Sequence, residues 1–180
     1  LGTTYTAAAV RRDCTVRVVQ LTGDSQAMPS VVAVRDDGEL IAGEAAERRA
    51  RTHPARAARE FKRRFGDPAP MVLGGRAFPV EDLTARLLTE VIDRTTAIEG
   101  SRPDRLALAH PASWGPFRCD ALRAAAARAG YDEVTLVPEP VAAALANQDR
   151  LPAGALVAVY DLGGGTFDAA VVRTTDPIEL

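Results

Sequence analysis

The chain has 180 residues, of which 47% are hydrophobic and 26% are charged, and its formal net charge at pH 7 is −2. This composition is ordinary for a globular protein with room for one sizeable domain or two small lobes. The charge excludes a general attraction to nucleic acid or to an anionic membrane. The longest apolar runs have the length of strands, far short of the roughly 20 residues that cross a bilayer, so no membrane segment is predicted here.

The two cysteines, Cys14 and Cys119, lie far apart and have no Cys or His neighbour at ligand spacing. This pattern indicates neither a zinc site nor a disulfide framework, and it favours a reducing, cytoplasmic setting. Because the first residues already resemble the inside of a strand and turn, we expect a few native residues to precede Leu1.

The first part of the chain is predicted to form a β-meander that leads into an arginine-rich helical stretch. Residues 4–10 and 15–21 are β-prone runs joined by RRDC, which predicts a hairpin, and residues 30–34 followed by DDG predict a third strand and a turn. Residues 43–65 have a helical pattern that is broken at His53-Pro54. The following segments DPAP and GGRAFP are predicted to be loop and turn.

The rest of the chain alternates between helices and strands. Apolar residues recur every three or four positions over 80–99, which predicts an amphipathic helix that ends at Gly100. The following elements are expected, in order, as a strand at 106–110, a helix at 117–129, a strand at 134–137, a helix at 140–147 and strands at 155–160 and 166–172. This alternation predicts a mainly parallel sheet with helices packed on it.

The stretch YDLGGGTFDAAVV at 160–172 contains the clearest chemical signal. Gly163, Gly164 and Gly165 lie between two predicted strands and are bracketed by Asp161 and Asp168. Glycines allow a turn to present backbone N–H groups to an anion at close range, and carboxylates on either side suit Mg²⁺. The alternative is a simple hairpin turn with two solvated aspartates.

The chain opens with a similar pattern, in which Gly2 is followed by the hydroxyl side chains of Thr3 and Thr4 at a predicted turn between strands. These groups can donate hydrogen bonds to phosphate oxygens. A Gly-Thr-Thr turn on its own is more often a plain hairpin. Two such loops, one at each end of an α/β chain, favour a phosphate site.

Three segments, LGTT, VPEPVAAALA and DLGGGTFD, occur in the order found in the actin-like ATPases. They resemble most closely the seventy-kilodalton heat-shock chaperone (DnaK-like) family. The resemblance runs over essentially the whole chain and implies an α/β fold, the actin-like (ribonuclease H-like) lobe, with a mixed sheet flanked by helices and a small inserted subdomain. On this resemblance, the chain would correspond to the first lobe of the family's nucleotide-binding domain. The implied division is a core of 1–35 and 80–180 and an insert of 36–79.

The resemblance also implies roles for single residues. Lys62, the only lysine among the 22 basic residues, matches the family's catalytic lysine in FKRRFG and would contact the γ-phosphate and the attacking water. A compact ammonium can follow a phosphoryl group, whereas a guanidinium would occupy the place of the water. The resemblance assigns phosphate contacts to Gly2, Thr3, Thr4, Gly163, Gly164, Gly165 and Thr166, and assigns Mg²⁺ (mostly through water) and the hydrolytic water to Glu139, Asp161 and Asp168.

Pro111 matches a proline that the family uses as a switch between nucleotide state and its peptide-binding domain. The switch arginine of the family falls on Cys119, with Arg118 one position away, so the coupling is in doubt at this point. The family's aspartate before the first loop would precede Leu1, and its second lobe would begin about where this chain ends. We therefore expect weak or no ATP binding and no activity from these 180 residues alone.

The function implied is an ATP-binding and ATP-hydrolysing lobe of a DnaK-like heat-shock chaperone, with ATP/ADP and Mg²⁺ as cofactors and a cytoplasmic location. Peptide clients would bind through a domain outside this chain, and a co-chaperone and a nucleotide exchange factor are possible partners. The alternatives are an actin-like filament protein, a sugar-kinase-type phosphotransferase, and a DnaK-like ATPase with a non-chaperone C-terminal region.

Eight basic residues lie between 48 and 64 and could form a patch for nucleic acid or an acidic partner. Glu44, Glu47 and Glu60 can pair with them, so a solvated helical face is the favoured interpretation and no nucleic-acid partner is expected. On this interpretation the neighbours of Lys62 in EFKRRFG are expected to serve only in helix packing and at the solvent face.

Overall fold

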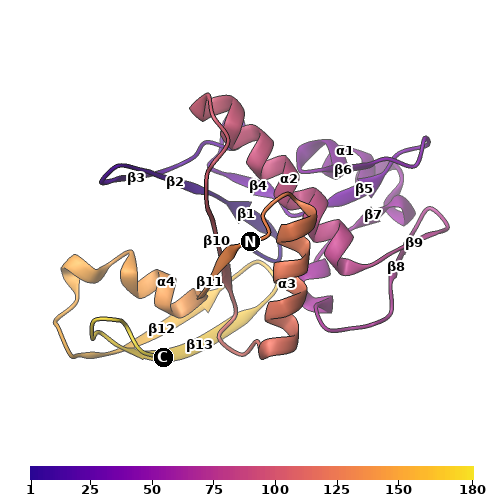
Figure 1. The fold of residues 1–180 in the computed structure, drawn as a ribbon. Coiled ribbons are helices and arrows are strands. Elements are labelled where there is room, and N and C mark those ends of the chain that lie inside the picture. Colours follow the sequence, from indigo (N-terminus) through magenta and orange to yellow (C-terminus); the bar gives the residue numbers. More distant parts are fainter.

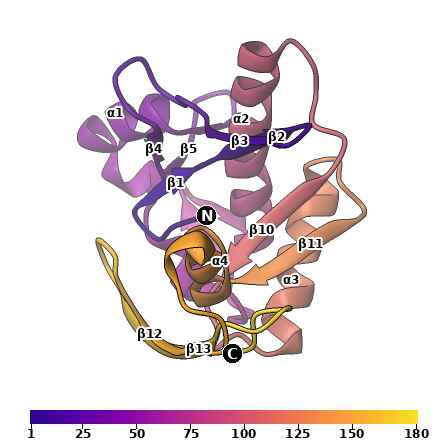
Figure 2. The ribbon, with the colours of Figure 1, turned by 90° about the vertical axis from the view of Figure 1, so that its left-hand side faces the viewer.

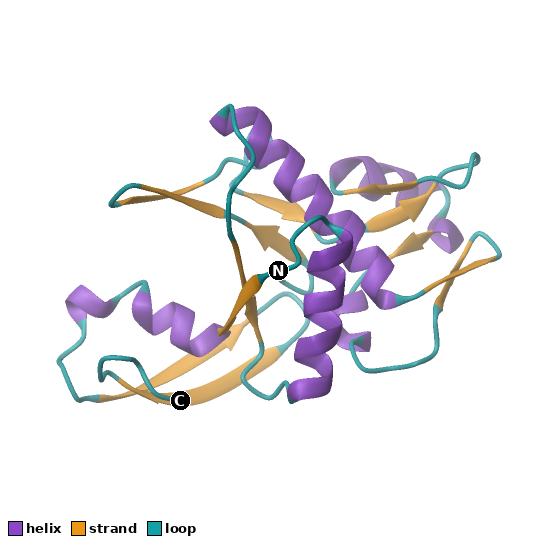
Figure 3. Ribbon diagram, in the orientation of Figure 1, coloured by secondary structure: helices purple, strands orange, loops and turns teal.

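The computed structural model describes residues 1–180, and its fold is mixed α/β with six small sheets and four α-helices (Figures 1 and 3). Figure 1 shows the long helix α2 running diagonally through the molecule, with the hairpin β12–β13 and helix α4 on one side of it and α1 with β5 to β9 on the other. None of the helices is both long and apolar enough to span a bilayer.

Helix α2, Val80–Glu99, organises the hydrophobic core. Its apolar residues recur at the spacing that predicted it, and they form one buried stripe that includes Leu83 and Leu87, both 0% exposed. The helix ends at Gly100, whose φ of 76° is the left-handed conformation that glycine adopts readily at helix C-termini. The prediction of a helix over 80–99 is therefore confirmed.

The N-terminal strands are arranged differently from a single meander. The expected strand 4–10 is divided at Ala8 into β1, Tyr5–Ala7, which pairs antiparallel with β4, Ala27–Pro29, and β2, Ala9–Arg12, which pairs with β3, Thr15–Val18. The predicted hairpin at RRDC is confirmed. Its two-residue loop is Asp13-Cys14, and Asp13 has a φ of 55°, as tight hairpin turns require.

The stretch 43–65 is only partly helical, which corrects the expectation. Helix α1, Glu44–Thr52, ends before Pro54, which has no N–H to donate and which disfavours helical backbone at His53. The chain continues through two 3₁₀ turns, η1 (Pro54–Arg56) and η2 (Phe61–Arg64), with a short strand β7, Ala57–Ala58, between them. That strand pairs with β5, Val32–Val34, so it contributes to the sheet β6-β5-β7, in which β6 is Leu40–Ala42.

The prediction of a mainly parallel sheet is wrong. The one parallel pair is β10, Leu106–His110, with β11, Val134–Pro138, and helix α3, Pro116–Arg128, forms the crossover between them. Strands β12, Leu156–Leu162, and β13, Phe167–Arg173, are antiparallel, because the four residues that join them can only turn the chain back. Strands β8, Met71–Leu73, and β9, Arg76–Phe78, form another antiparallel hairpin.

The hairpin β12–β13 packs against α4, Glu139–Leu145, and curves away from the remaining sheets (Figure 2). The chain reaches it through the 3₁₀ turn η3, Gln148–Arg150. The turn of this hairpin lies against the first residues of the chain, since a Cβ on Gly164 would be 2.6 Å from Thr4 Oγ1. The two glycine loops found in the sequence are thereby brought together.

Replacement of Leu83 by Ala should lower the free energy of unfolding by about 2–5 kcal/mol, since it leaves a cavity at a fully buried position of α2. Leu145→Ala, on an α4 side chain that is 46% exposed, is the matched control and should cost less than about 1 kcal/mol. Urea denaturation followed by circular dichroism measures both. Equal losses for the two variants would show that α2 is not the centre of the core.

Candidate functional site

A buried ion pair joins two distant segments of the chain. The Lys62 Nζ donates to Glu139 Oε1 at 2.5 Å, and the two side chains are 9% and 20% exposed. Lys62 lies in η2, and Glu139 is the first residue of α4, directly after strand β11. In the structure Lys62 therefore points inward and meets Glu139, while the catalytic roles of both residues stay predictions.

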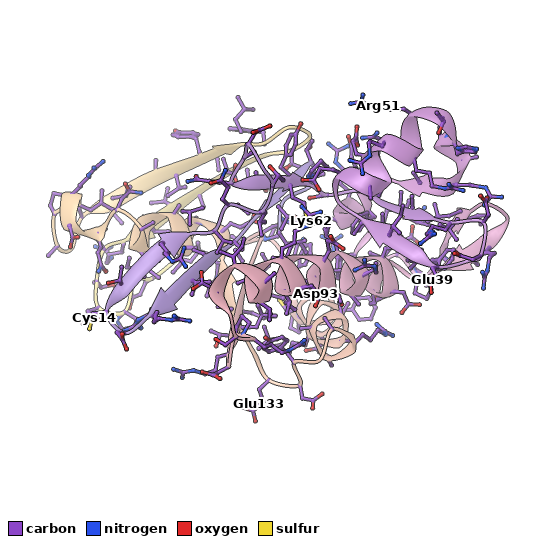
Figure 4. The ribbon with its side chains drawn as sticks, turned by 90° about the horizontal axis from the view of Figure 1, so that it is seen from above. Cys14, Glu39, Arg51, Lys62, Asp93 and Glu133 are labelled. Carbon is purple, nitrogen blue, oxygen red and sulfur yellow. The ribbon has the colours of Figure 1, made fainter.

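The residues around Lys62 explain its position. Phe61 and Phe65 are each 2% exposed and anchor η2 in the hydrophobic core, so the lysine between them is held inside the molecule. The ring of Phe65 packs on Trp114 at 4.8 Å between centroids, and the Lys62 Nζ lies 5.9 Å from the Trp114 ring centroid. An ammonium at that distance from an indole is attracted by the ring. Figure 4 shows Lys62 in the interior, whereas Cys14, Glu39, Arg51 and Glu133 lie at the periphery.

The first loop is held by a residue that the sequence analysis missed. Ser30, at the junction of β4 and β5, donates its Oγ hydrogen bond to the Gly2 carbonyl at 2.8 Å, and its N–H donates to the Thr4 carbonyl at 2.9 Å. The chain folds back so tightly that a Cβ on Gly2 would lie 2.1 Å from the Tyr5 carbonyl oxygen, so only glycine fits. The sequence offered only a serine directly before the apolar run VVAV as a signal for this role.

The second loop, residues 163–166, lies directly against the first. A Cβ on Gly164 would lie 2.6 Å from Thr4 Oγ1, so any side chain there would push the two loops apart. The glycines of this loop are needed for this close approach, because none of the three has a φ in the left-handed region. The Gly163 N–H closes the turn by donating to the Thr166 carbonyl at 2.9 Å.

The hydroxyl of Thr4 is a polar group without a partner where the loops meet. Thr4 Oγ1 is buried and makes no hydrogen bond. A buried hydroxyl left unpaired costs free energy, and such exceptions in folded proteins are concentrated at functional positions. Because the two loops are in direct contact here, a phosphate oxygen would have to reach this hydroxyl at the edge of the contact and not between the loops.

Two adjoining cavities contain most of the predicted site residues. The larger, about 360 Å³, is lined by Glu139, Asp161 and Asp168 among others. The smaller, about 190 Å³, is lined by these ten residues: Thr3, Lys62, Arg63, Phe65, Pro111, Ser113, Trp114, Arg118, Thr166 and Asp168. Asp168 and Ser113 line both cavities, so the hydroxyls of Thr3 and Thr166, the lysine and the three carboxylates surround one continuous region, whereas Thr4 and the loop glycines line neither cavity.

The carboxylates are compatible with Mg²⁺ bound mostly through water. Asp161 and Asp168 are opposite each other in the register of β12 and β13, and both line the larger cavity with Glu139. No group of three or more His, Cys, Asp or Glu side chains is close enough to enclose an ion directly. Mg²⁺ commonly uses one or two carboxylates and completes its shell with waters and phosphate oxygens, which is the donor set available here.

Two residues predicted to form the interdomain switch also line this region. Pro111 and Arg118 both line the smaller cavity, and Arg118 packs within 3.3 Å of the position that a Cβ on Gly66 would take. The Cys119 Sγ is turned instead toward the Trp114 carbonyl oxygen at 3.8 Å. Arg118 is therefore the residue of this pair that faces the cavity, while its role as a switch stays a prediction.

Comparison with known proteins identifies the family of the chain. The family model of Hsp70 protein matches residues 1–73 and 68–177. The chaperone protein DnaK of Thermotoga neapolitana is 31% identical over 180 residues, which cover 99% of this chain and 30% of that protein. Those of Thermotoga petrophila and Thermotoga maritima are each 32% identical over 175 residues, which cover 96% of this chain and 29% of each relative.

The chain thus spans about 30% of the length of the curated relatives that it matches. The two family-model matches together extend from the first loop, through Lys62 and Glu139, past the second loop. The loops that meet at Thr4, the buried lysine and the mixed α/β architecture all agree with that match, and the chain therefore belongs to the Hsp70 protein family, with its actin-like ATPase fold.

Proposed function

We propose that this chain supplies the first phosphate-handling lobe of an ATP-hydrolysing, DnaK-like chaperone. The observation that carries the proposal is the contact between the two glycine loops at Thr4, together with the cavity that Thr3 and Thr166 of these loops line with Lys62, the cation of the ion pair with Glu139. This arrangement places donors for phosphate oxygens next to a cation and a carboxylate. Phosphoryl transfer needs mainly such positioning and charge neutralisation.

The residues of the site would have separate roles in phosphate binding and hydrolysis. Thr3, Thr4, Thr166 and the backbone N–H groups of Gly163 to Gly165 would bind phosphate oxygens, with Gly2 allowing the close turn. Lys62 would neutralise charge that develops on the transferred phosphate, and Glu139 would orient the ammonium and the attacking water. Bound Mg²⁺ would neutralise phosphate charge, and Asp161, Asp168 and Glu139 would hold its waters.

The wider assignments rest on the family and on the relatives' printed names. ATP and ADP would be the nucleotides, and peptide clients would bind a domain outside these 180 residues, with a co-chaperone and a nucleotide exchange factor as further partners. We propose a cytoplasmic location for the protein. Pro111 and Arg118, both at the smaller cavity, would report nucleotide state to the rest of the protein.

The domain division follows the same logic. Residues 1–35 and 80–180 would form the core that carries both loops, and residues 36–79 would form the insert that carries Lys62. The ion pair with Glu139 would then be one of the polar links from the insert to the core, with the Arg94–Glu44 ion pair as another. We further propose that the 180 residues alone bind ATP weakly or not at all, because the resemblance assigns the adenosine contacts to a second lobe.

Lys62→Arg in the full-length protein should slow single-turnover ATP hydrolysis by about 10²–10³-fold. The positive charge is kept, but the wider guanidinium would occupy the space needed by the attacking water. Rapid mixing of limiting ATP with excess protein, followed by product quantification, measures the rate constant. Binding of ADP should change much less than the hydrolysis rate.

The matched control is Arg51→Lys, on an exposed α1 side chain that makes no ion pair, and its rate should equal that of the unmodified protein. Thermal unfolding of each variant checks that the fold is retained. Hydrolysis by Lys62→Arg at the unmodified rate would show that this lysine has no catalytic role.

A further inference from the structure

Arg63, the residue after the buried lysine, also lies at the cavity. Its side chain is 47% exposed and lines the smaller cavity with Lys62, Thr3 and Thr166. The neighbours of Lys62 in EFKRRFG were expected only in packing or at the solvent face, and Arg63 lies at both the solvent face and the cavity. The cavity lining contains three cations, Lys62, Arg63 and Arg118, but Asp168 is its only carboxylate, so the lining favours an anion.

A glutamate one turn earlier holds this arginine. Glu60 Oε2 accepts from Arg63 Nη1 at 3.0 Å, and the glutamate is 49% exposed, so solvent screens the pair. Glu60 has a φ of 53°, a left-handed conformation that is uncommon for a residue with a side chain and is concentrated at functional positions. This conformation begins η2, the turn that contains both Lys62 and Arg63.

Both members of the pair lie against the second glycine loop. A Cβ on Gly165 would be 3.2 Å from Arg63 Nη2 and 3.6 Å from Glu60 Oε1. The guanidinium thus contacts a carboxylate and also lies against the loop that borders the unpaired Thr4 hydroxyl. A phosphate bound at this loop would lie within reach of a guanidinium that already has a competing partner.

We propose that Arg63 is a further phosphate-binding residue of the site, and that Glu60 regulates it by competing with the bound phosphate for the guanidinium. The proposal rests on the proposed function, which supplies the phosphate as the ligand. A guanidinium pairs in a planar, two-point manner with either a carboxylate or a phosphate, and engagement of one weakens its contact with the other. Glu60 therefore lowers the affinity for phosphate, and its removal raises that affinity.

The test measures the dissociation constant of inorganic phosphate on the full-length protein saturated with Mg²⁺ and ADP, by isothermal titration calorimetry. Arg63→Gln should weaken phosphate binding by about 5- to 10-fold, and Arg63→Lys should weaken it less, because it keeps the charge without the two-point contact. Glu60→Gln should tighten phosphate binding by about 2- to 5-fold. The double variant should behave as Arg63→Gln alone, since Glu60 acts only through Arg63.

The matched control is Arg64→Gln. Arg64 is the next residue, pairs with Asp67 outside the cavity, and should leave phosphate binding unchanged. Thermal unfolding verifies that each variant is folded. Phosphate affinity that is unchanged in Arg63→Gln would overturn the proposal, as would a Glu60→Gln variant that binds phosphate more weakly. An unmodified protein that binds neither ADP nor phosphate would instead overturn the proposed function itself.

Discussion

The ion pair between Lys62 and Glu139 is the interaction on which the rest of the site depends. Removing two charges from water is costly, and the cost is recovered only when both charges find good partners. Here the lysine lies between two buried phenylalanines and near an indole ring, while the glutamate begins a helix, where a carboxylate is favoured by the helix dipole. One hydrogen bond thereby holds together two residues that lie 77 positions apart in the chain.

The core explains why this pair can be held so firmly. Helix α2 contributes most of its buried stripe to the same cluster that contains Phe61 and Phe65, so η2 is anchored on the longest element of the fold. On the other side, α4 packs against β12 and β13 and continues directly from β11. The lysine and the second glycine loop are therefore positioned by separate elements that meet at the centre of the molecule, and the glycines allow the contact because they have no side chains.

Much of this could be predicted from the sequence where the signal is local. The period of the apolar residues predicted α2, the turn residues predicted the β2–β3 hairpin, and the two glycine motifs marked the loops that the structure places in contact. Strand partners could not be predicted in the same way. Whether β13 runs antiparallel or parallel to β12 depends on the length of the connection between them and on packing against α4. The apolar pattern of the strands does not encode either factor.

The residues that sequence reasoning missed have a common cause. Ser30, Trp114 and Arg63 are ordinary residue types whose importance comes only from what tertiary structure places beside them. Ser30 is significant because two loop carbonyls accept its hydrogen bonds, and Arg63 because a glycine loop lies next to it. Likewise, the orientation of α3 places Arg118, and not Cys119, at the cavity. An alignment in which the two residues differ by one position could not show which of them faces the cavity.

The most direct test of a phosphate site formed by the two loops and the ion pair is a crystal structure of the full-length protein with Mg²⁺, ADP and inorganic phosphate. The account predicts phosphate oxygens within hydrogen-bonding distance of Thr4 Oγ1 and of the Lys62 ammonium, with the two glycine loops still in contact. Phosphate bound elsewhere, with the Thr4 hydroxyl still buried and unpaired, would contradict it.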